Sequence, residues 1–600
     1  MCGIAGIVKS NRDIDLKIVM QSMLDAIIHR GPDGEGLLIF DSLALGHRRL
    51  SILDLSTNAS QPMNYMAKYE IVFNGEIYNY IEIKNVLVEK GYAFKSQSDT
   101  EVIMASYDYW GNECVNQFNG MWSFAIYDIE KNILFCSRDR FGIKPFYYTQ
   151  HNGGFYFSSE IKQLLIAGVP ARVNYQIMMD YIVMGMEEHT ENTFFDSIHK
   201  LPASHSMVFD LSTHTFEIFR YYTLEVKKEY LSLSKKESLE LFEKEMLRSV
   251  KYRLRSDVKV GTCLSGGLDS SYVASVASKV YGLNTNEQLV AITAKSIDEK
   301  KDESHYAQKV VEACNLSWHV VEPSTSDFKN DLFDIVKVQE EPFGSPSIFM
   351  QYYVFKEAKK IGCAVLLDGQ GGDETLMGYE NYYTSYVLSK SLLKKPYAIF
   401  NASRNSKLGL LKTIKYCFYF GNTKIRINHL KKRIPFIRKE AIDRVDFSIL
   451  HELTKATNNS QLLQVLEIAK TKLPHLLKYE DRNSMINSIE TRLPFLDYKL
   501  VELMISLPFN HKIYKGWTKY ILREAVSKNL PDSIAWRKNK YGFEAPEEIW
   551  LNDKDFIMNE ISQSKLLKNV ITNSYSFENK RMTWRLLNIA IWEKCYKVNL

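Results

Sequence analysis

The hydrophobic pattern of this 600-residue chain changes near residue 238. Before that point, short apolar runs of the kind that form strands are separated by helical patterns. After it, each apolar run is followed by a helical pattern, and this alternation predicts a parallel sheet covered by helices. Beyond residue 375 the pattern is mainly helical. Because one hydrophobic core does not serve a chain of this length, we expect two or three domains.

The two patterns predict two kinds of fold in one chain. Residues 1–210 are expected to form an α+β domain built on antiparallel sheets, and residues 211–237 a polar connection. Strands are predicted there at 4–8, 71–73, 122–127, 133–136 and 155–157, and helices at 15–28, 79–90 and 99–110. Residues 238–600 are expected to form an α/β domain with a parallel sheet and a largely helical C-terminal part. Its strands are predicted at 258–264, 288–294, 318–321 and 364–367, and its helices at 238–252, from 270, from 304 and at 347–360.

The positive charge of the chain is concentrated in one segment. The formal net charge is +5, yet residues 381–439 contain fourteen Lys or Arg and no Asp or Glu, so the remainder is net acidic. We interpret residues 381–475 as a basic helical insertion. Its lysines are either solvated or face anionic lipid headgroups or a polyanionic substrate. No nucleic-acid recognition motif accompanies the charge, so we do not expect nucleic acid as a partner.

Composition and cysteine usage favour a cytoplasmic globular protein. Hydrophobic residues make up 45% of the chain and charged residues 24%, which excludes a disordered or fibrous chain. The eight cysteines are scattered and form no C-x-x-C pair, as is typical of a reducing compartment. The N-terminus has no basic segment before its short apolar run, and no stretch reaches about 18 consecutive apolar residues. We therefore expect neither a signal peptide nor a membrane span.

Cys2 directly follows the initiator methionine. Its small side chain permits removal of Met1, and Cys2 would then carry both a thiol and an α-amine of pKa about 8. The amine can act as a base for the thiol, directly or through a water. Residues 3–8 are small or apolar and predict a strand, so we expect this terminus to be buried in a sheet.

Three further segments contain residues that suit the same chemistry. Residues 29–33 (HRGPD) predict a rigid turn, and residues 47–52 (HRRLSI) place a guanidinium beside a strand. In residues 73–79 (FNGEIYN) a strand ends in Asn74-Gly75. Such a pair is usually a plain turn. An amide side chain and a glycine N–H are, however, also neutral donors that can form an oxyanion hole.

Together these segments resemble the glutaminase domain of class II (N-terminal nucleophile) glutamine amidotransferases. The resemblance implies layered αββα packing of two antiparallel sheets. It implies that Cys2 attacks the side-chain amide of glutamine and releases ammonia, while Asn74 and Gly75 stabilise the oxyanion. The glutamine-binding residues that it implies are Arg49 for the carboxylate and Asp99 for the α-amine, together with Ile52, Asn74 and Glu76.

A glycine-rich loop follows the first predicted strand of the second domain. Its sequence is Ser265-Gly266-Gly267-Leu268-Asp269-Ser270. Small residues let backbone N–H groups approach an anion, and the start of the next helix adds positive potential. The loop lacks the lysine of a Walker A motif and the glycine spacing of a Rossmann motif. It resembles the PP-loop of ATP pyrophosphatases, which cleave ATP between the α and β phosphates, and this resemblance makes Asp269 a carboxylate for magnesium pyrophosphate.

A second acidic loop, at residues 367–374, ends the next long strand. Carboxylates beside flexible glycines suit Mg²⁺ that is bound to phosphate oxygens. This loop resembles the corresponding region of glutamine-dependent asparagine synthetases, in which Asp373 would be the second metal carboxylate. One position departs from that family, because Met377 stands where a glycine is usual, and we expect the change to alter the rim of the acceptor pocket.

Segments nearer the C-terminus resemble the same family, at residues 481–485, 488–497 and 515–523. In the last of these, the resemblance implies that Lys519 lies near the ATP phosphates, where its charge would oppose the negative charge of the transferring group. The ATP-binding residues that the resemblance implies are Leu264, Ser265, Gly266, Gly267, Asp269, Ser270, Ala294, Asp368 and Gly369.

The two halves predict one reaction. Adenylation turns a carboxylate oxygen into a leaving group, and ammonia made locally from glutamine then displaces AMP. The sequence predicts asparagine synthesis from aspartate, ATP and glutamine with Mg²⁺, by a cytoplasmic homodimer. An alternative keeps this machinery and changes the acceptor to another carboxylate, such as a sugar acid of a surface polysaccharide or a peptide-like metabolite. A catalytically inactive binding protein is disfavoured because Cys2, Asp269 and Asp373 are all present.

Overall fold

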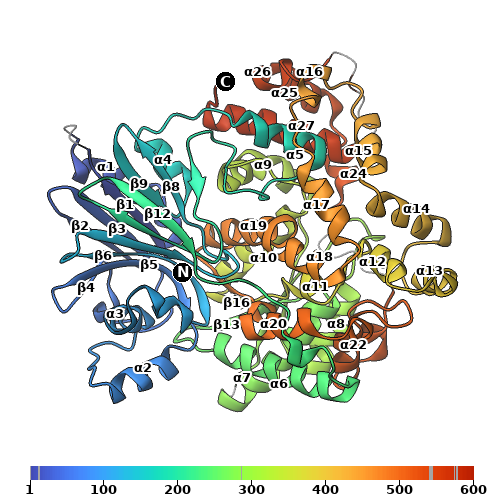
Figure 1. Ribbon diagram of the computed structural model, residues 1–600, viewed down its shortest axis with the longest axis horizontal. Helices are drawn as coiled ribbons and strands as arrows, with labels where there is room; N and C mark the ends of the chain where they lie inside the picture. Colours follow the sequence, from blue (N-terminus) through green and yellow to red (C-terminus); the bar gives the residue numbers. More distant parts are fainter. Residues whose placement is uncertain (1, 11–13, 286, 539–544, 573–574, 576–578) are drawn as a thin grey trace.

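The N-terminal part of the chain contains two antiparallel sheets (Figure 1). The structure is a computed structural model that describes residues 2–10, 14–285, 287–538, 545–572, 575 and 579–600. The strand order in the first sheet is β10 (His199–Lys200), β8 (Tyr147–His151), β9 (Gly154–Ser158), β1 (Gly3–Val8), β3 (Leu43–Arg49) and β2 (Gly34–Ile39). In the second sheet it is β12 (Thr215–Arg220), β11 (His205–Asp210), β7 (Ile133–Arg138), β6 (Gly120–Asp128), β5 (Tyr69–Ile77) and β4 (Met63–Tyr65).

Helices cover both outer faces of this pair of sheets (Figure 1). On the first sheet they are α1 (Leu16–Asp25), α4 (Ile161–Ile166) and α5 (Tyr175–Met184), and on the second α2 (Tyr80–Glu89) and α3 (Asp99–Trp110). The alternation of side chains along β1 shows how the layers form, because Ala5 packs toward the helices and Ile4 toward the second sheet. The predicted αββα layering is confirmed.

The second sheet continues beyond residue 210. β12 lies in the segment for which we expected a polar connection, and it pairs with β11 from His205–Arg220 to Asp210–Thr215. The helix α6 (Lys235–Arg253) then begins close to the predicted position, capped by Ser234, whose side chain accepts a hydrogen bond from the amide of Glu237. The polar composition of residues 211–237 therefore conceals an edge strand.

The second part of the chain is built on a parallel sheet, as predicted. The strand order is β15 (Ser317–Val321), β14 (Val290–Ala294), β13 (Val260–Cys263), β16 (Val365–Leu367) and β17 (Glu490–Arg492). Helices that follow these strands include α7 (Leu268–Asn284), α8 (Ser304–Cys314), α9 (Thr325–Gln339) and α10 (Ile348–Lys360). β14, the next strand along the chain, lies on one side of β13, whereas the later strand β16 lies on its other side, so the strand order reverses at β13. A sheet of this kind binds ligands at the carboxyl ends of its strands, next to such a reversal of strand order.

The segment 381–475 is helical and has an apolar core of its own. Its main helices are α12 (Tyr382–Leu388), α13 (Lys395–Arg404), α14 (Leu410–Gly421), α15 (Thr423–Lys432), α17 (Ser448–Ala456) and α18 (Ser460–Leu466). Of these, α13, α14 and α15 lie at the edge of the molecule away from the antiparallel sheets (Figure 1). Their shared core includes Tyr386, Leu450 and the side chain of Met377, which precedes the insertion.

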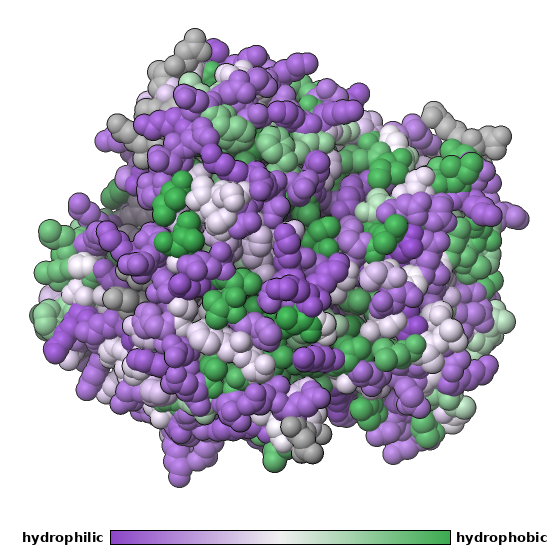
Figure 2. Space-filling view, turned by 180° about the vertical axis from the view of Figure 1, so that it is seen from behind, coloured by the Kyte–Doolittle hydropathy of each residue, from purple (hydrophilic) through white to green (hydrophobic). Residues whose placement is uncertain are grey.

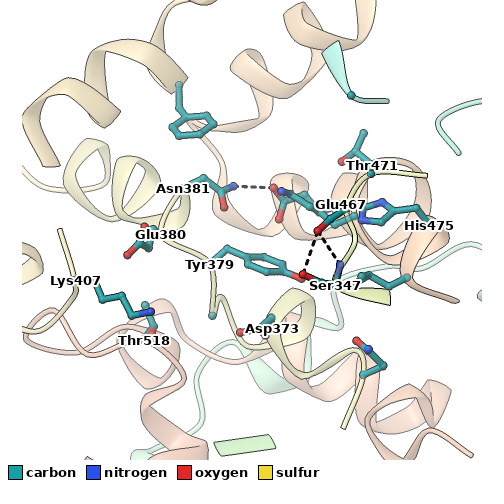
Figure 3. A pocket seen from close by; sticks show the side chains of 18 of the residues that line it. Ser347, Asp373, Tyr379, Glu380, Asn381, Lys407, Glu467, Thr471, His475 and Thr518 are labelled. Carbon is teal, nitrogen blue, oxygen red and sulfur yellow. Dashed lines mark hydrogen bonds between the residues drawn. The ribbon is translucent and has the colours of Figure 1, made fainter. Parts of the chain in front are cut away.

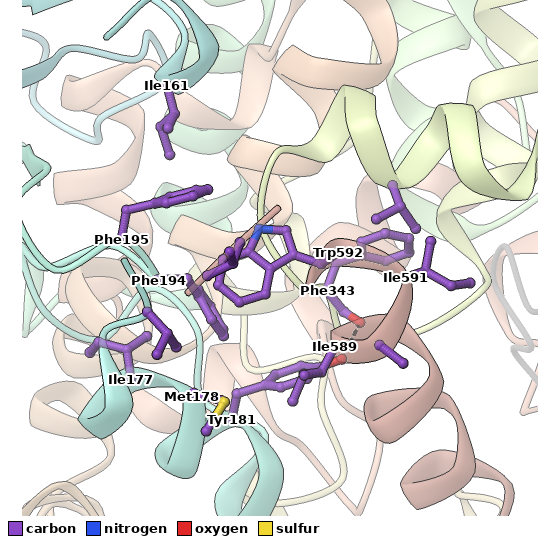
Figure 4. Close-up of a cluster of buried hydrophobic side chains, with 14 of the residues drawn as sticks. Ile161, Ile177, Met178, Tyr181, Phe194, Phe195, Phe343, Ile589, Ile591 and Trp592 are labelled. Carbon is purple, nitrogen blue, oxygen red and sulfur yellow. Dashed lines mark hydrogen bonds between the residues drawn. The ribbon is translucent and has the colours of Figure 1, made fainter. Parts of the chain in front are cut away.

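The C-terminal helix α27 (Lys580–Tyr596) returns to the N-terminal half and joins the two parts of the protein. Trp592 packs against Phe194 and Phe195, and the Tyr181 hydroxyl of α5 donates a hydrogen bond to the carbonyl of Phe343 at 2.7 Å (Figure 4). These residues belong to one large buried cluster that both halves share. None of the helices in the described part of the chain is long and apolar enough to cross a membrane.

Candidate active sites

Cys2 lies at the start of β1, between β3 and β9, and is only 9% exposed. Its backbone amide donates to the Asn74 Oδ1 atom at 3.1 Å, and the Arg30 Nε atom donates to its carbonyl at 3.0 Å. Burial raises the pKa of the Cys2 thiol, so the thiol is protonated at neutral pH and needs a base before it can attack a substrate. The terminus is therefore fixed in a sheet, as the small and apolar residues after it predict.

The strand does not end at Asn74-Gly75 as predicted. Both residues lie within β5, which continues to Ile77, and they are opposite Ser123 and Trp122 of β6. The Asn74 Nδ2 group is buried and has no hydrogen-bond partner among the described residues. Only a glycine fits at position 75, because a Cβ atom there would lie 2.1 Å from the carbonyl oxygen of Met121. A buried amide donor without a partner beside the nucleophile is the arrangement that an oxyanion hole requires.

Four of the residues predicted to bind glutamine, Arg49, Ile52, Glu76 and Asp99, line one small cavity beside Cys2, whereas the fifth, Asn74, does not line it. Its lining includes Cys2, Arg49, Ile52, Gly75, Glu76 and Asp99. The guanidinium of Arg49 donates to the Ser56 carbonyl at 2.8 Å and to the Asp54 carbonyl, which leaves other N–H groups for a ligand. Burial raises the pKa of Asp99 to about 6, and its Oδ2 atom accepts from the Ile77 amide at 2.8 Å. A bound ammonium group would restore the charge of this carboxylate.

The cavity also has lining residues that no motif in the sequence predicts. Gln61, Phe73, Ser98 and Thr100 also line it. Ser98 and Thr100 flank the predicted Asp99, and their position at the start of α3 could have indicated them. Gln61 carried no comparable signal, because its place depends on the loop before β4.

Two motifs that lie far apart in the sequence meet next to Cys2. The guanidinium of Arg30 is fully buried and donates to both oxygens of Asp481, at 2.8 and 3.1 Å, and to Glu160 at 2.9 Å. Asp481 lies on α19 (Leu473–Met485) in the second half of the chain. In the second contact, Arg492 lies 3.6 Å from Glu76, which lines the cavity beside Cys2. Charged side chains of the second half thus support this cavity.

The glycine-rich loop connects β13 to the N-terminus of α7, with Gly267 as the residue before the helix. The hydroxyls of Ser265 and Ser270 are 3.0 Å apart, and the Gly267 amide donates to Ser265 Oγ at 3.2 Å. These bonds hold the loop around the start of a 17-residue helix, where unpaired N–H groups and the helix dipole favour an anion. Leu264 directly follows β13, which ends at Cys263, and Ala294 ends the neighbouring strand β14.

The acidic loop after β16 lies against the glycine-rich loop. A Cβ atom at Gly372 would lie 2.5 Å from Asp269 Oδ1, so the missing side chain is what permits this approach. Asp368 begins the loop, and its Oδ1 atom accepts from the Gly369 amide at 2.5 Å. Burial raises the pKa of Asp368 to about 6. The predicted ATP-binding residues of both loops thus converge at the carboxyl ends of β13 and β16.

Lys519 lies between the two predicted metal carboxylates. Its Nζ atom is 2.6 Å from both oxygens of Asp269 and 2.5 Å from Asp373 Oδ1. It precedes α22 (Tyr520–Ser527), whereas Asp373 lies on the short helix α11 (Gly372–Thr375). The described residues contain no group of three or more metal-ligating side chains. Two converging carboxylates nevertheless fit Mg²⁺, which takes one or two carboxylates together with phosphate oxygens and water.

A large cavity of about 1150 Å³ opens from Asp373 and Lys519 toward the insertion (Figure 3). In Figure 3 the ring of Tyr379 lies between Asp373 on one side and Asn381 and Glu467 on the other. Met377 does not line this cavity in the described structure, which corrects our expectation for the pocket rim. The Met377 backbone has φ +56°, and its side chain is buried in the core of the insertion.

Comparison with known proteins identifies both halves. A family model described as a glutamine amidotransferase domain matches residues 1–222, and one described as asparagine synthase matches residues 241–592. "Asparagine synthetase [glutamine-hydrolyzing] 1" of Bacillus subtilis is 30% identical, covering 99% of this chain and 96% of its own length. A putative asparagine synthetase of Methanocaldococcus jannaschii is 37% identical over 64% of this chain and 77% of its own. "Amidase chry2" of Gibberella zeae is 27% identical, covering 88% of this chain and 85% of its own length.

Proposed function

The chain belongs to the asparagine synthetase family of glutamine-hydrolysing amidotransferases, and on that premise we propose that it makes asparagine from aspartate, glutamine and ATP. The observation that carries the proposal is the presence of two sites, one around Cys2 and one around Asp269, Asp373 and Lys519. The first supplies ammonia and the second activates a carboxylate.

In the first site, Cys2 is the nucleophile. After removal of Met1, the α-amine of Cys2 takes the proton of the thiol, and the thiolate attacks the side-chain carbonyl of glutamine. Asn74 Nδ2 and the Gly75 N–H bind the oxyanion that develops. Arg49 holds the carboxylate of glutamine, Asp99 its α-amine, and Ile52 and Glu76 complete the pocket. Ammonia leaves, and water then releases glutamate from the thioester.

In the second site, the chain binds ATP and activates the acceptor. The loop from Leu264 to Ser270, together with Ala294, Asp368 and Gly369, holds the nucleotide. Asp269 and Asp373 would hold Mg²⁺, which when bound neutralises phosphate charge. Lys519 contacts both carboxylates and is placed to oppose negative charge at the reacting phosphate. The acceptor carboxylate attacks the α-phosphate, pyrophosphate leaves, and ammonia then displaces AMP.

Aspartate-dependent pyrophosphate release is expected from the purified protein. With ATP, Mg²⁺ and glutamine present, addition of aspartate should raise pyrophosphate release well above the rate without an acceptor, because only adenylation of a carboxylate releases pyrophosphate. A coupled phosphate assay measures the rate, and glutamate in place of aspartate is the control. Equal rates with and without aspartate would exclude aspartate as the acceptor and leave the family assignment intact.

A second candidate acceptor is a different carboxylate, such as a sugar acid. The lining of the cavity favours it, because Arg426, Lys472, Arg581 and Arg585 line its wall and suit an acceptor with a further anionic group. The names of relatives at this level of identity also differ, because one of them is called an amidase. The same pyrophosphate assay, run with uronic acids in place of aspartate, separates the two candidates.

We also propose that the insertion contacts an anionic surface. Leu393 is 95% exposed and Leu411 74% exposed, and both lie among the lysines of residues 381–439. In the view from behind, apolar side chains appear at the left edge, on the side that carries α13 and α14 (Figure 2). Exposed apolar groups beside many lysines are typical of a surface that binds anionic lipid headgroups. All eight cysteines are free, which supports a cytoplasmic location, and the homodimer remains a proposal.

Neutralising Lys431, Lys432 and Arg433 to glutamine is expected to weaken binding to anionic vesicles by about 100-fold at low salt, at about 1 kcal/mol for each charge. Co-sedimentation with phosphatidylglycerol vesicles measures the effect. The matched control removes three exposed lysines of α6, Lys236, Lys244 and Lys251. If the unmodified protein does not sediment with the vesicles, the lipid surface does not exist.

A further inference from the structure

The large cavity has an arm beyond Tyr379 that an aspartate-sized acceptor does not need. We propose that this arm binds the remote part of a larger acceptor, one that carries hydroxyl groups and a second anionic group such as a phosphate. The arm is defined by Arg426, Glu467, Thr471, Lys472, Arg581 and Arg585. The inference rests on the ATP-dependent amidation proposed above and specifies the second candidate acceptor.

Four cations line this arm without a carboxylate partner. Within the described residues, no ion pair joins Arg426, Lys472, Arg581 or Arg585 to a carboxylate. Glu467 attracts Arg426 and Lys472, and Glu187 attracts Arg585, from beyond ion-pair distance. Lys472 instead lies 5.1 Å from the centre of the Tyr379 ring, and Arg426 lies 5.3 Å from that of Phe420. Arginines and lysines that face a cavity and lack acidic partners are suited to an anionic ligand.

The acidic residues of this region do not cancel these cations. Glu187, Glu380 and Glu467 line the same cavity. Burial raises the pKa of Glu187 to about 8, so its carboxyl group is mostly protonated at neutral pH. Burial also raises the pKa values of Glu380 and Glu467. Even if all three carboxyl groups were ionised, they would be fewer than the four cations, so the arm carries a net positive charge.

Several buried polar atoms on the arm have no partner in the described structure. They are Arg426 Nε, Glu467 Oε2 and Thr471 Oγ1. Glu467 is 2% exposed, and its other oxygen accepts from Asn381 Nδ2 at 2.7 Å (Figure 3). Buried polar groups are almost always hydrogen-bonded, so a set of unpartnered ones around a cavity indicates a polar ligand. A carboxylate oxygen and a threonine hydroxyl are the partners that sugar hydroxyls use.

The backbone brings these groups together by an unusual turn. Residues Glu467–Thr471 form a π-helix directly before α19, and Lys472 follows it. Single π-turns of this kind occur often at functional sites. The turn places Glu467, Thr471 and Lys472 at one end of α19, on the wall of the arm, while Arg581 and Arg585 come from α27 on another wall. The arm is thus built by three separate parts of the chain.

Glucuronic acid 1-phosphate is the probe for this arm, because it carries a carboxylate, hydroxyls and a remote phosphate. Titration calorimetry on the full-length protein should show binding with a Kd below about 1 mM. Replacing Arg426 and Lys472 together with glutamine should weaken that binding by about tenfold or more. The matched control replaces Lys424 and Lys431 with glutamine. Both are exposed lysines of α15, the helix that carries Arg426, and neither lines the cavity. Unchanged glutamine hydrolysis shows that both variants are folded.

Two comparison ligands separate the possible sources of binding. Glucuronic acid without phosphate should bind more weakly than the probe, and inorganic phosphate should not match the probe. No binding of the probe, equal loss in the control variant, or equal affinity for inorganic phosphate would each overturn the inference. Because calorimetry needs no turnover, failure of pyrophosphate release would count against the proposed function and not against this arm.

Discussion

Replacing Cys2 with alanine is expected to abolish glutamine-dependent amidation and to leave ammonia-dependent amidation largely intact. The variant removes the only atom that can form a thioester with glutamine in the first site, so the glutamine-dependent rate should fall by about 10³-fold or more. The second site lies on a different sheet, after β13 and β16, and needs ammonia from any source. Product formation is measured with glutamine and, separately, with an ammonium salt above pH 8.

The Cys2→Ala result needs a control for loss of a thiol elsewhere. Cys417 lies in the insertion and forms no disulfide, so Cys417→Ala is the matched variant and should keep both activities. If Cys2→Ala loses the ammonia-dependent rate to the same extent as the glutamine-dependent rate, the proposal that the Cys2 site serves only to release ammonia is wrong.

Replacing Asp269 with asparagine is expected to lower pyrophosphate release by about 10²- to 10³-fold with either nitrogen source. Asp269 contacts Lys519 through both oxygens and lies at the start of α7, where the phosphates are proposed to bind. The substitution removes one of two carboxylates for Mg²⁺ and changes little in volume. Pyrophosphate release is measured with glutamine and with ammonium.

The matched control for this substitution is Asp334→Asn, which changes an exposed aspartate on α9. It should leave pyrophosphate release and glutamine hydrolysis unchanged. If Asp269→Asn retained the full rate of pyrophosphate release, the assignment of the glycine-rich loop to ATP would fail.

The regular parts of the fold were predictable because their local signals agree. Residues 99–110 form a helix with the predicted bounds, and Ser98 caps its N-terminus. The apolar runs at 258–264 and 288–294 predict buried parallel strands, and both are present. The strand β17 was not predictable, because it consists of Glu490, Thr491 and Arg492. Its charged residues are buried in pairs with one another and with distant carbonyls, which no local pattern reveals.

Motifs in the sequence located the two candidate sites, but not the contacts that join them. Cys2, Gly75 and Asp99 come from separate elements and line one cavity. The pairing of Arg30 with Asp481 spans 451 residues, and only the packing of α19 against the first half brings the two together. The lining of the large cavity likewise depends on how the insertion folds back over the acidic loop.

The basic segment could be recognised from composition alone. The structure divides its charged residues between the exterior of the protein and the wall of the large cavity. Lys431 and Lys432 are exposed on α15, whereas Arg426 of the same helix faces the large cavity. Charge counting cannot separate these positions, because it ignores which face of a helix a residue occupies. The insertion therefore contributes both to the surface proposed to contact anionic lipid and to the wall of the large cavity.

The most direct test of the account measures glutamine hydrolysis and pyrophosphate release side by side in Cys2→Ala and Asp269→Asn. We predict that Cys2→Ala loses glutamine hydrolysis and keeps ammonia-dependent pyrophosphate release. We predict that Asp269→Asn keeps glutamine hydrolysis and loses pyrophosphate release. If both folded variants lost both activities, the proposal that two separate sites share one reaction would be contradicted.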